Sequence, residues 1–130
     1  MTTTTNPQRT VTISLSGTGA DAKATYSYVS PVTGAPHVNA TVCDLECHQA
    51  SYCLYILDFA STQAGWTLTG TSPNGGHAGM TSVPGALNLS LLTFDPYTCY
   101  STYRFYLHYL NTLTDTKIEI DPQEGNVPRR

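Results

Sequence analysis

The segment CDLECHQASYC, residues 43–53, contains three of the four cysteines of the chain and one of its four histidines. Thiolate sulfur and imidazole nitrogen are ligands that Zn²⁺ prefers, and four of them arranged as a tetrahedron form a structural zinc site. The candidate zinc ligands are Cys43, Cys47, His48, and either Cys53 or Cys99. The spacing argues against zinc, because the usual two-residue knuckle is missing and adjacent residues such as Cys47 and His48 rarely complete one tetrahedron.

The same cysteines allow two other interpretations, a disulfide framework or reduced thiols. The N-terminal residues MTTTTNPQRT lack the apolar segment of a secretory signal, so we expect a cytoplasmic protein with mostly reduced thiols. Cys53 also lies in an apolar run, where a thiol usually packs as a small hydrophobic side chain. The sequence therefore favours inert cysteines with no bound cofactor, while a disulfide and a zinc site remain alternatives.

A second candidate site involves two loop-like segments. The glycine-rich stretch NGGHAG places His77 in a loop, and DLECHQAS is interpreted either as one helical turn capped by Asp44 or as another loop. Loops at one end of a β-sandwich commonly carry binding and catalytic groups. A pocket there, with His77 beside a Cys or Asp partner, would fit a small-ligand binder or a hydrolase. The chain has no G-x-S-x-G nucleophile elbow, so the sequence identifies no catalytic residue.

The overall composition limits the classes of partner. Charged residues make up 12% of the chain, and the net charge is -3. The sequence has no basic cluster apart from Arg129 and Arg130, whereas a nucleic-acid partner requires a basic surface. No apolar run approaches the length of a membrane span. We therefore expect neither a nucleic-acid partner nor a membrane partner.

Alternating apolar and polar residues predict short β-strands along the chain. In RTVTISL, Val11, Ile13 and Leu15 alternate with polar residues, which gives a strand one buried and one wet face. Turn residues separate further such segments, namely AKATYSYV, HVNATVC, SYCLYILDF, GWTLTG, ALNLSLLTF, YSTYRFYLHYL and TDTKIEID. About seven to eight strands with no helical repeat predict an all-β fold, a sandwich of two antiparallel sheets. Residues 9–130 are expected to form this single domain, and residues 1–8 a flexible leader.

Three of these segments carry more definite expectations. SYCLYILDF is apolar on both sides, so it is expected to be a central strand covered on both faces. In ALNLSLLTF, Leu87, Leu89 and Leu91 are expected to share one side of a strand. In the longest segment, one face is expected to carry Tyr103, Phe105, Leu107 and Tyr109, and the other Arg104, Tyr106 and His108.

The C-terminal stretch TKIEIDPQEGNVPRR resembles the end of the DP-EP family of small bacterial proteins. The matching positions are Asp121, Pro122, Glu124, Asn126 and Pro128. The segments YSYVSPVTG and CLYILDFASTQAGWTLTG also resemble that family, so the similarity covers most of residues 9–129, although the Glu-Pro dipeptide is absent. Bacterial inclusion-body proteins of the PixA and AidA type have a similar pattern and are the alternative family.

The resemblance implies an immunoglobulin-like β-sandwich. It implies no activity, cofactor or site residue, because the family is essentially uncharacterised. Pro122 cannot donate a hydrogen bond to a sheet, so the last strand is expected to end there. The tail, residues 121–130, is then expected to lie across a sheet edge or the bottom of the sandwich and seal it.

The sequence supports three functional hypotheses. The first is a non-enzymatic structural or interaction module that forms a homo-oligomer or binds a protein partner, because the expected edge strands carry few Lys or Pro residues. The second is a small-ligand binder or hydrolase with its site at the sandwich-end loops. The third is a thiol or zinc module in residues 43–53.

Overall fold

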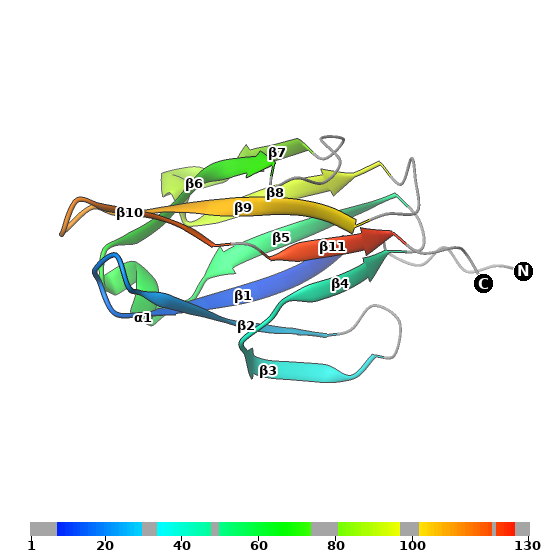
Figure 1. Ribbon diagram of the computed structural model, residues 1–130, viewed down its shortest axis with the longest axis horizontal. Helices are drawn as coiled ribbons and strands as arrows, with labels where there is room; N and C mark the ends of the chain where they lie inside the picture. The colour runs from blue at the N-terminus through cyan, green and yellow to red at the C-terminus, as the bar shows by residue number, and fades with distance from the viewer. Residues whose placement is uncertain are drawn as a thin grey trace, which may run out of the picture.

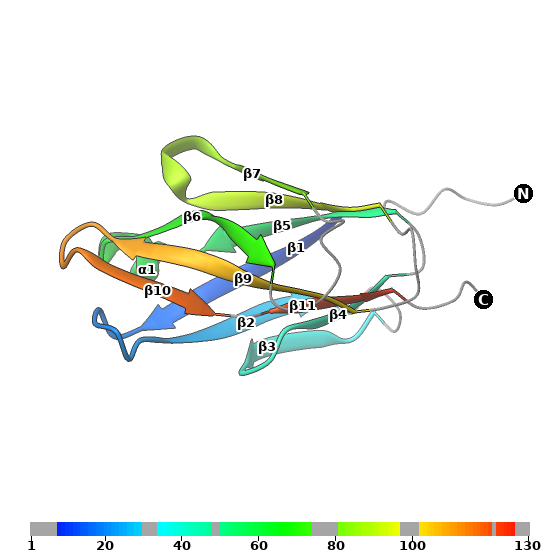
Figure 2. The same ribbon diagram turned by 45° about the horizontal axis from the view of Figure 1, so that its top comes forward.

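The computed structural model describes residues 8–29, 34–47, 50–73, 81–96, 102–120 and 122–126 (Figure 1). In this part of the chain, short strands form two sheets that lie face to face (Figures 1 and 2). The all-β sandwich predicted from the sequence is therefore confirmed. The order of the strands within each sheet decides which side chains become neighbours and which strands lie at an edge.

The first sheet has six strands in the order β3-β2-β1-β5-β8-β7. Its strands are β1 (Gln8–Ser16), β2 (Lys23–Val29), β3 (Pro36–Ala40), β5 (Ser51–Leu57), β7 (Thr81–Pro84) and β8 (Ser90–Asp95). The second sheet has five strands, β4 (Asp44–Cys47), β6 (Trp66–Pro73), β9 (Thr102–Asn111), β10 (Thr116–Ile120) and β11 (Gln123–Asn126). The described residues thus form eleven strands, more than predicted, because strands of four residues such as β4, β7 and β11 give little alternation.

Two pairs of neighbouring strands run parallel, which the prediction of antiparallel sheets did not include. β1 pairs with β5 in parallel, and β4 pairs with β11 in parallel. The chain leaves the first sheet after β3, forms β4 in the second sheet, and returns as β5 beside β1. Because this crossover passes through the other sheet, β5 can enter the first sheet in the same direction as β1.

Alternate side chains of both sheets fill the space between them. The buried apolar residues include Val11, Ile13, Leu15, Tyr26, Tyr55, Leu57, Trp66, Leu68, Leu91, Phe105, Leu107 and Tyr109. Aromatic rings connect the sheets, since Tyr55 of β5 lies edge-on to Phe105 of β9 with ring centres 6.1 Å apart. Trp66 packs edge-on against Tyr109 at 6.5 Å, and its indole N–H donates to the carbonyl of Gly17 at 3.0 Å. The inward residues predicted for β1 and β9 are confirmed wherever their side chains are described.

β5 is a central strand, as expected, but only one of its faces is buried. The inner residues Cys53, Tyr55 and Leu57 are buried, whereas Tyr52 on the outer face is exposed. The second sheet covers only the inner face of the first sheet, so the predicted cover on both faces is wrong. Apolar residues on the outer face of a strand do not show that this face is covered, because single apolar residues are common on protein surfaces.

The segment ALNLSLLTF is a strand only in its second half. Ala86–Asn88 form a 3₁₀-turn, η1, in which Leu87 has a positive φ of 58° and is 84% exposed. Of the three leucines predicted to share one side, Leu91 in β8 is buried and Leu87 is not. The alternation is misleading here because a turn with left-handed residues interrupts the run before β8 begins.

A short helix, α1 (Phe59–Gln63), connects β5 to β6, and strand alternation does not predict it. Asp58 caps this helix, because the Ser61 amide donates to Oδ1 of Asp58 at 2.8 Å. The Ser61 hydroxyl accepts a hydrogen bond from the Leu15 amide of β1, also at 2.8 Å. The cap therefore joins the helix to the first sheet as well as starting it.

The DLECHQ segment contains the strand β4, so the expected helical turn or loop is wrong for residues 44–47. Leu45 is fully buried in the core, and β4 pairs with β11 along its length. A helical turn at residues 44–47 would lose both of these interactions. The C-terminal tail supplies this partner, because β11 pairs with β9 on one side and with β4 on the other. Residues 123–126 therefore lie inside the second sheet rather than across an edge of it.

Candidate functional site

The sequence-predicted cysteine site divides between core positions and residues outside the described ranges. Cys43 and Cys53 are both buried in the core and neither forms a disulfide. His48 and Cys99, the side chain of Cys47, and the candidate base His77 lie outside the described part of the structure. The zinc, disulfide and His77 hypotheses therefore stay predictions. In the described ranges, no group of three or more His, Cys, Asp or Glu side chains is placed to hold a metal ion.

The surroundings of Cys43 are those of a core residue. Burial raises the pKa of the Tyr109 phenol well above its ordinary value, and the neighbouring Tyr26 and Cys43 raise it further. Cys43 is only 1% exposed, so its sulfur lies in the apolar interior beside these two rings. A thiol in such a position packs as a small hydrophobic group and is inaccessible to a solvent oxidant.

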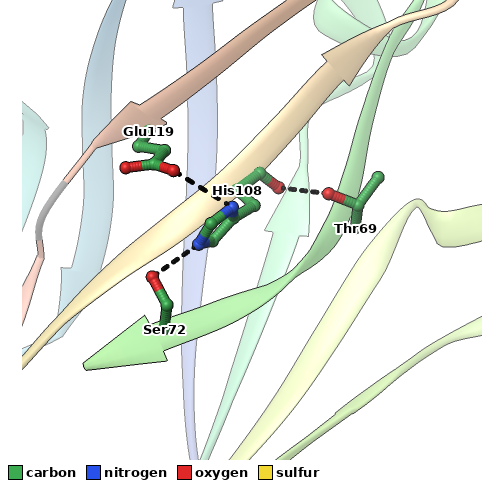
Figure 3. A network of polar contacts seen from close by, with 4 residues as sticks. All are labelled: Thr69, Ser72, His108 and Glu119. Carbon is green, nitrogen blue, oxygen red and sulfur yellow. Dashed lines mark hydrogen bonds and ion pairs between the residues drawn. The ribbon is translucent and has the colours of Figure 1, made fainter.

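A polar row of three side chains lies on the outer face of the second sheet. The polar row consists of Ser72 on β6, His108 on β9 and Glu119 on β10 (Figure 3). Oγ of Ser72 lies 2.6 Å from Nε2 of His108, and Nδ1 of His108 lies 3.6 Å from Oε1 of Glu119. The hydroxyl of Thr69 donates to the backbone carbonyl of His108 at 3.3 Å. Serine, imidazole and carboxylate are thus connected in that order across three neighbouring strands.

The pairing of the strands explains why these residues meet. His108 stands directly opposite Glu119 in the β9–β10 pair, so their side chains project to the same side of the sheet. Ser72 stands opposite Tyr106, which also faces outward, and it reaches His108 diagonally. The sequence correctly predicts the outward direction of His108, because alternation along β9 is regular, and the same alternation along β10 turns Glu119 outward.

Ser72 reaches the outer face only because β6 contains a bulge. The register of β6 against β9 shifts between Leu68 and Gly70, so Thr69 is an extra residue. Before the bulge, Leu68 faces the core opposite Tyr109, and after it Gly70 stands opposite His108. Without the extra residue the direction of every later side chain would invert, and Ser72 would point into the core. The glycine in TLTGTS is the sequence signal that could have indicated this bulge.

Two members of the polar row, His108 and Glu119, border an open hollow of about 670 Å³ on the sheet surface, whereas Ser72 is not among the residues that line it. His108 and Glu119 line it together with Thr69, Leu110, Ile118 and Lys117. The side chain of His108 is 31% exposed and that of Glu119 is 54% exposed, so solvent screens their interaction. The hollow therefore offers a base, a cation and an apolar surface within a small area.

The arrangement allows a proton to move from the Ser72 hydroxyl to Nε2 of His108. If Nδ1 of His108 carries its proton toward Glu119, Nε2 is the acceptor and the Ser72 hydroxyl is the donor. The separation of 3.6 Å between His108 and Glu119 is too long for a hydrogen bond, so Glu119 acts on His108 mainly through charge. This interaction becomes attractive between opposite charges when His108 is protonated.

A comparison with known protein families finds no family model that matches the chain, and a search of curated proteins also finds no match. The resemblance to the DP-EP family or to the PixA and AidA type therefore stays a prediction, and so does the immunoglobulin-like assignment. In the described part of the chain, no helix has the length and apolar character needed to cross a membrane.

Proposed function

We propose that the protein is an interaction module in which β3 of one copy pairs with β3 of a second copy. β3 is the outermost strand of the six-stranded sheet, with β2 on one side and no described strand of this sheet on the other. In Figure 1 it forms the lower border of the molecule. An edge strand with available backbone N–H and C=O groups is a template for pairing with another chain.

The residue types of β3 support this proposal. The strand sequence, PHVNA, contains no Lys, Arg, Asp or Glu, the charged residues that commonly protect an edge from association. Val38 is 73% exposed, and Val29 on β2 and Val42 just beyond β3 are exposed as well. A second strand docked on this edge would remove part of this apolar surface from water, which favours association.

The other borders of the two sheets are less suited to pairing. β10 carries the exposed charges of Lys117 and Glu119, and β4 contains two acidic residues in DLEC. β7 ends at Pro84, and the hydroxyls of Ser82 on β7 and Thr71 on β6 share a hydrogen bond of 2.8 Å. That contact connects the borders of the two sheets on this side of the sandwich. The uncharged, apolar edge of β3 is therefore the observation that carries the proposal.

Local contacts hold β3 in position before any partner arrives. The ring of His37 stacks on Tyr28 of β2, with ring centres 4.7 Å apart and an angle of 14° between the planes. The Asn39 amide donates to the hydroxyl of Ser27 at 3.1 Å. Such preorganisation lowers the entropy lost on association. Pro36 and a register shift opposite β2 shorten the regular part of the edge, so we expect a weak dimer.

The proposal is tested by sedimentation equilibrium over a wide concentration range. The wild-type chain should shift from monomer to dimer as concentration rises. Val38→Lys places a charge on the edge of β3 and should keep the protein monomeric. Val83→Lys is the matched control, because Val83 on β7 is 64% exposed and lies on the opposite border of the same sheet.

Each outcome of this experiment is decisive. A dimer that Val38→Lys abolishes and Val83→Lys preserves supports pairing through β3. A wild-type chain that stays monomeric at the highest concentration contradicts self-association. Dimerisation that survives Val38→Lys, or that both substitutions weaken equally, places the contact elsewhere and overturns the proposal.

A further inference from the structure

We propose a further activity for the polar row, in which Ser72 attacks small acyl esters with His108 as its general base. This activity does not depend on pairing through β3, because the polar row lies on the second sheet and β3 borders the first. The two proposals can therefore fail separately. Three features of the site support this activity, namely the imidazole that partners the Ser72 hydroxyl, the carboxylate beyond the imidazole, and the hollow beside His108.

The Ser72 hydroxyl differs from its neighbours in having a base as its partner. Its Oγ lies 2.6 Å from Nε2 of His108, which is within the reach required for general-base catalysis. By contrast, Ser82 shares its hydrogen bond with the hydroxyl of Thr71, and the Thr67 hydroxyl donates to the backbone carbonyl of Leu110. These partners cannot remove a proton at neutral pH, whereas a neutral imidazole can.

Glu119 stands on the far side of the imidazole. When His108 takes the proton of Ser72, the imidazolium faces a carboxylate whose Oε1 is 3.6 Å from Nδ1. The opposite charges then attract, which favours the protonated form that arises during attack. Glu119 does not contact Ser72, so its role is to position and stabilise His108.

The hollow beside His108 extends toward Leu110 and Lys117, and Ser72 stands outside its lining, opposite Tyr106. Leu110 gives the hollow an apolar surface, and Lys117 and Glu119 line it with opposite charges. Because the hollow is open to solvent, we expect slow turnover of short-chain esters rather than tight binding of a large substrate.

The reaction balances with the residues present and water. A bond forms between Ser72 Oγ and the ester carbonyl carbon, the carbon–oxygen bond to the leaving alcohol breaks, and the serine proton moves to Nε2 of His108. With p-nitrophenyl acetate the leaving group departs as p-nitrophenolate, and His108 releases its proton to water. A water molecule then attacks the acetyl-serine, giving up a proton to His108, which returns a proton to Oγ as acetate leaves.

The experiment measures p-nitrophenolate release and locates the acetyl group by peptide mass spectrometry. With the wild-type chain we expect acetylation of Ser72 in a short reaction. Ser72→Ala and His108→Asn should each lower the rate by at least about tenfold, because a positioned general base contributes about 10²–10⁴ to such reactions. Ser82→Ala is the matched control and should leave the rate unchanged, since its hydroxyl has no imidazole partner.

Thermal unfolding of each variant separates a loss of chemistry from a loss of fold. Ser72→Ala and His108→Asn should melt close to the wild type, because both side chains lie on the outer face. The proposal is overturned if the wild-type protein releases p-nitrophenolate no faster than Ser72→Ala. It is also overturned if acetyl groups are found only on lysine and tyrosine side chains. If His108→Asn fails to fold, the Ser72→Ala rate and the acetylation map still decide it.

Discussion

The inner and outer faces of β9 share one backbone but have opposite environments. On the inner face, Phe105, Leu107 and Tyr109 are buried between the sheets. On the outer face, His108 is partly exposed and interacts with Ser72 and Glu119 from the neighbouring strands. Because successive side chains of a strand point to opposite sides, one strand can support a packed core and a polar row at once. The chemistry of the outer face should therefore be changeable without loss of the fold.

The two faces also differ in what places their residues. The inner residues follow regular alternation along β9, whereas the polar row depends on an irregularity in β6. The bulge at Thr69 sets Ser72 on the outer side and keeps Trp66 and Leu68 in the core. A single extra residue thus satisfies the core before the bulge and completes the polar row after it.

The largest effect is expected from a substitution on the inner face. Leu107→Ala should lower the free energy of unfolding by about 2–5 kcal/mol, because it leaves a cavity in the middle of the core. Urea denaturation followed by tryptophan fluorescence measures this, since Trp66 is the only tryptophan and is fully buried. Leu110→Ala, on the outer face of the same strand, should cost less. Equal losses for the two leucines would contradict the distinction between the faces.

An intermediate effect is expected from a partly buried polar contact at the end of the sandwich. Burial raises the pKa of the Asp58 carboxyl, but hydrogen bonds from the side chain and amide of Ser61 and from Ser14 more than offset this, so the pKa lies below its usual value. The resulting stabilisation is complete above the ordinary aspartate pKa of about 3.9, and it is lost as pH falls through the lower pKa of the folded state. Asp58→Ala should lower stability at neutral pH by about 1 kcal/mol through loss of the helix cap.

Asp58→Asn separates the charge from the cap. Asparagine caps helices about as well as aspartate, so this variant should retain most of the neutral-pH stability. It should also lose less stability than the wild type between neutral pH and pH values below the folded-state pKa of Asp58. Denaturation at several pH values makes the comparison, and parallel acid profiles for the two proteins would show that the carboxylate contributes nothing through its charge.

Much of the fold could be predicted from the sequence because it depends on alternation. The inward positions of β1 and the outward position of His108 repeat every second residue, and this period is visible without a structure. The helix α1 and the strand β4 are short, and their placement depends on partners distant in the sequence. The bond from the Leu15 amide of β1 to the Ser61 hydroxyl, which joins the capped helix to the first sheet, connects residues 46 positions apart and is seen only in the structure.

The polar row could be predicted only in part. Alternation places His108 and Glu119 on one face of the sheet, but it cannot show that β9 and β10 align them directly opposite each other. Ser72 was unpredictable for a stronger reason, because a regular β6 would turn it toward the core. The cysteines attracted attention by their density, yet Cys43 and Cys53 are core residues whose burial follows from the strands and adjoining turns around them.

The smallest effect on stability, and the sharpest test of the comparison, is expected from Glu119→Gln. Glu119 is 54% exposed and lies 3.6 Å from His108, and exposed ion pairs contribute little to stability, so unfolding should change by less than about 0.5 kcal/mol. If Glu119 stabilises protonated His108 during acyl transfer, the same substitution should lower kcat several-fold and leave KM nearly unchanged. Glu119→Asp keeps the charge and should retain more of kcat than Glu119→Gln. If Glu119→Gln lost as much stability as Leu107→Ala, the outer face would be shown to support the fold. An unchanged kcat in folded Glu119→Gln would show that Glu119 takes no part in acyl transfer, which would then depend on Ser72 and His108 alone.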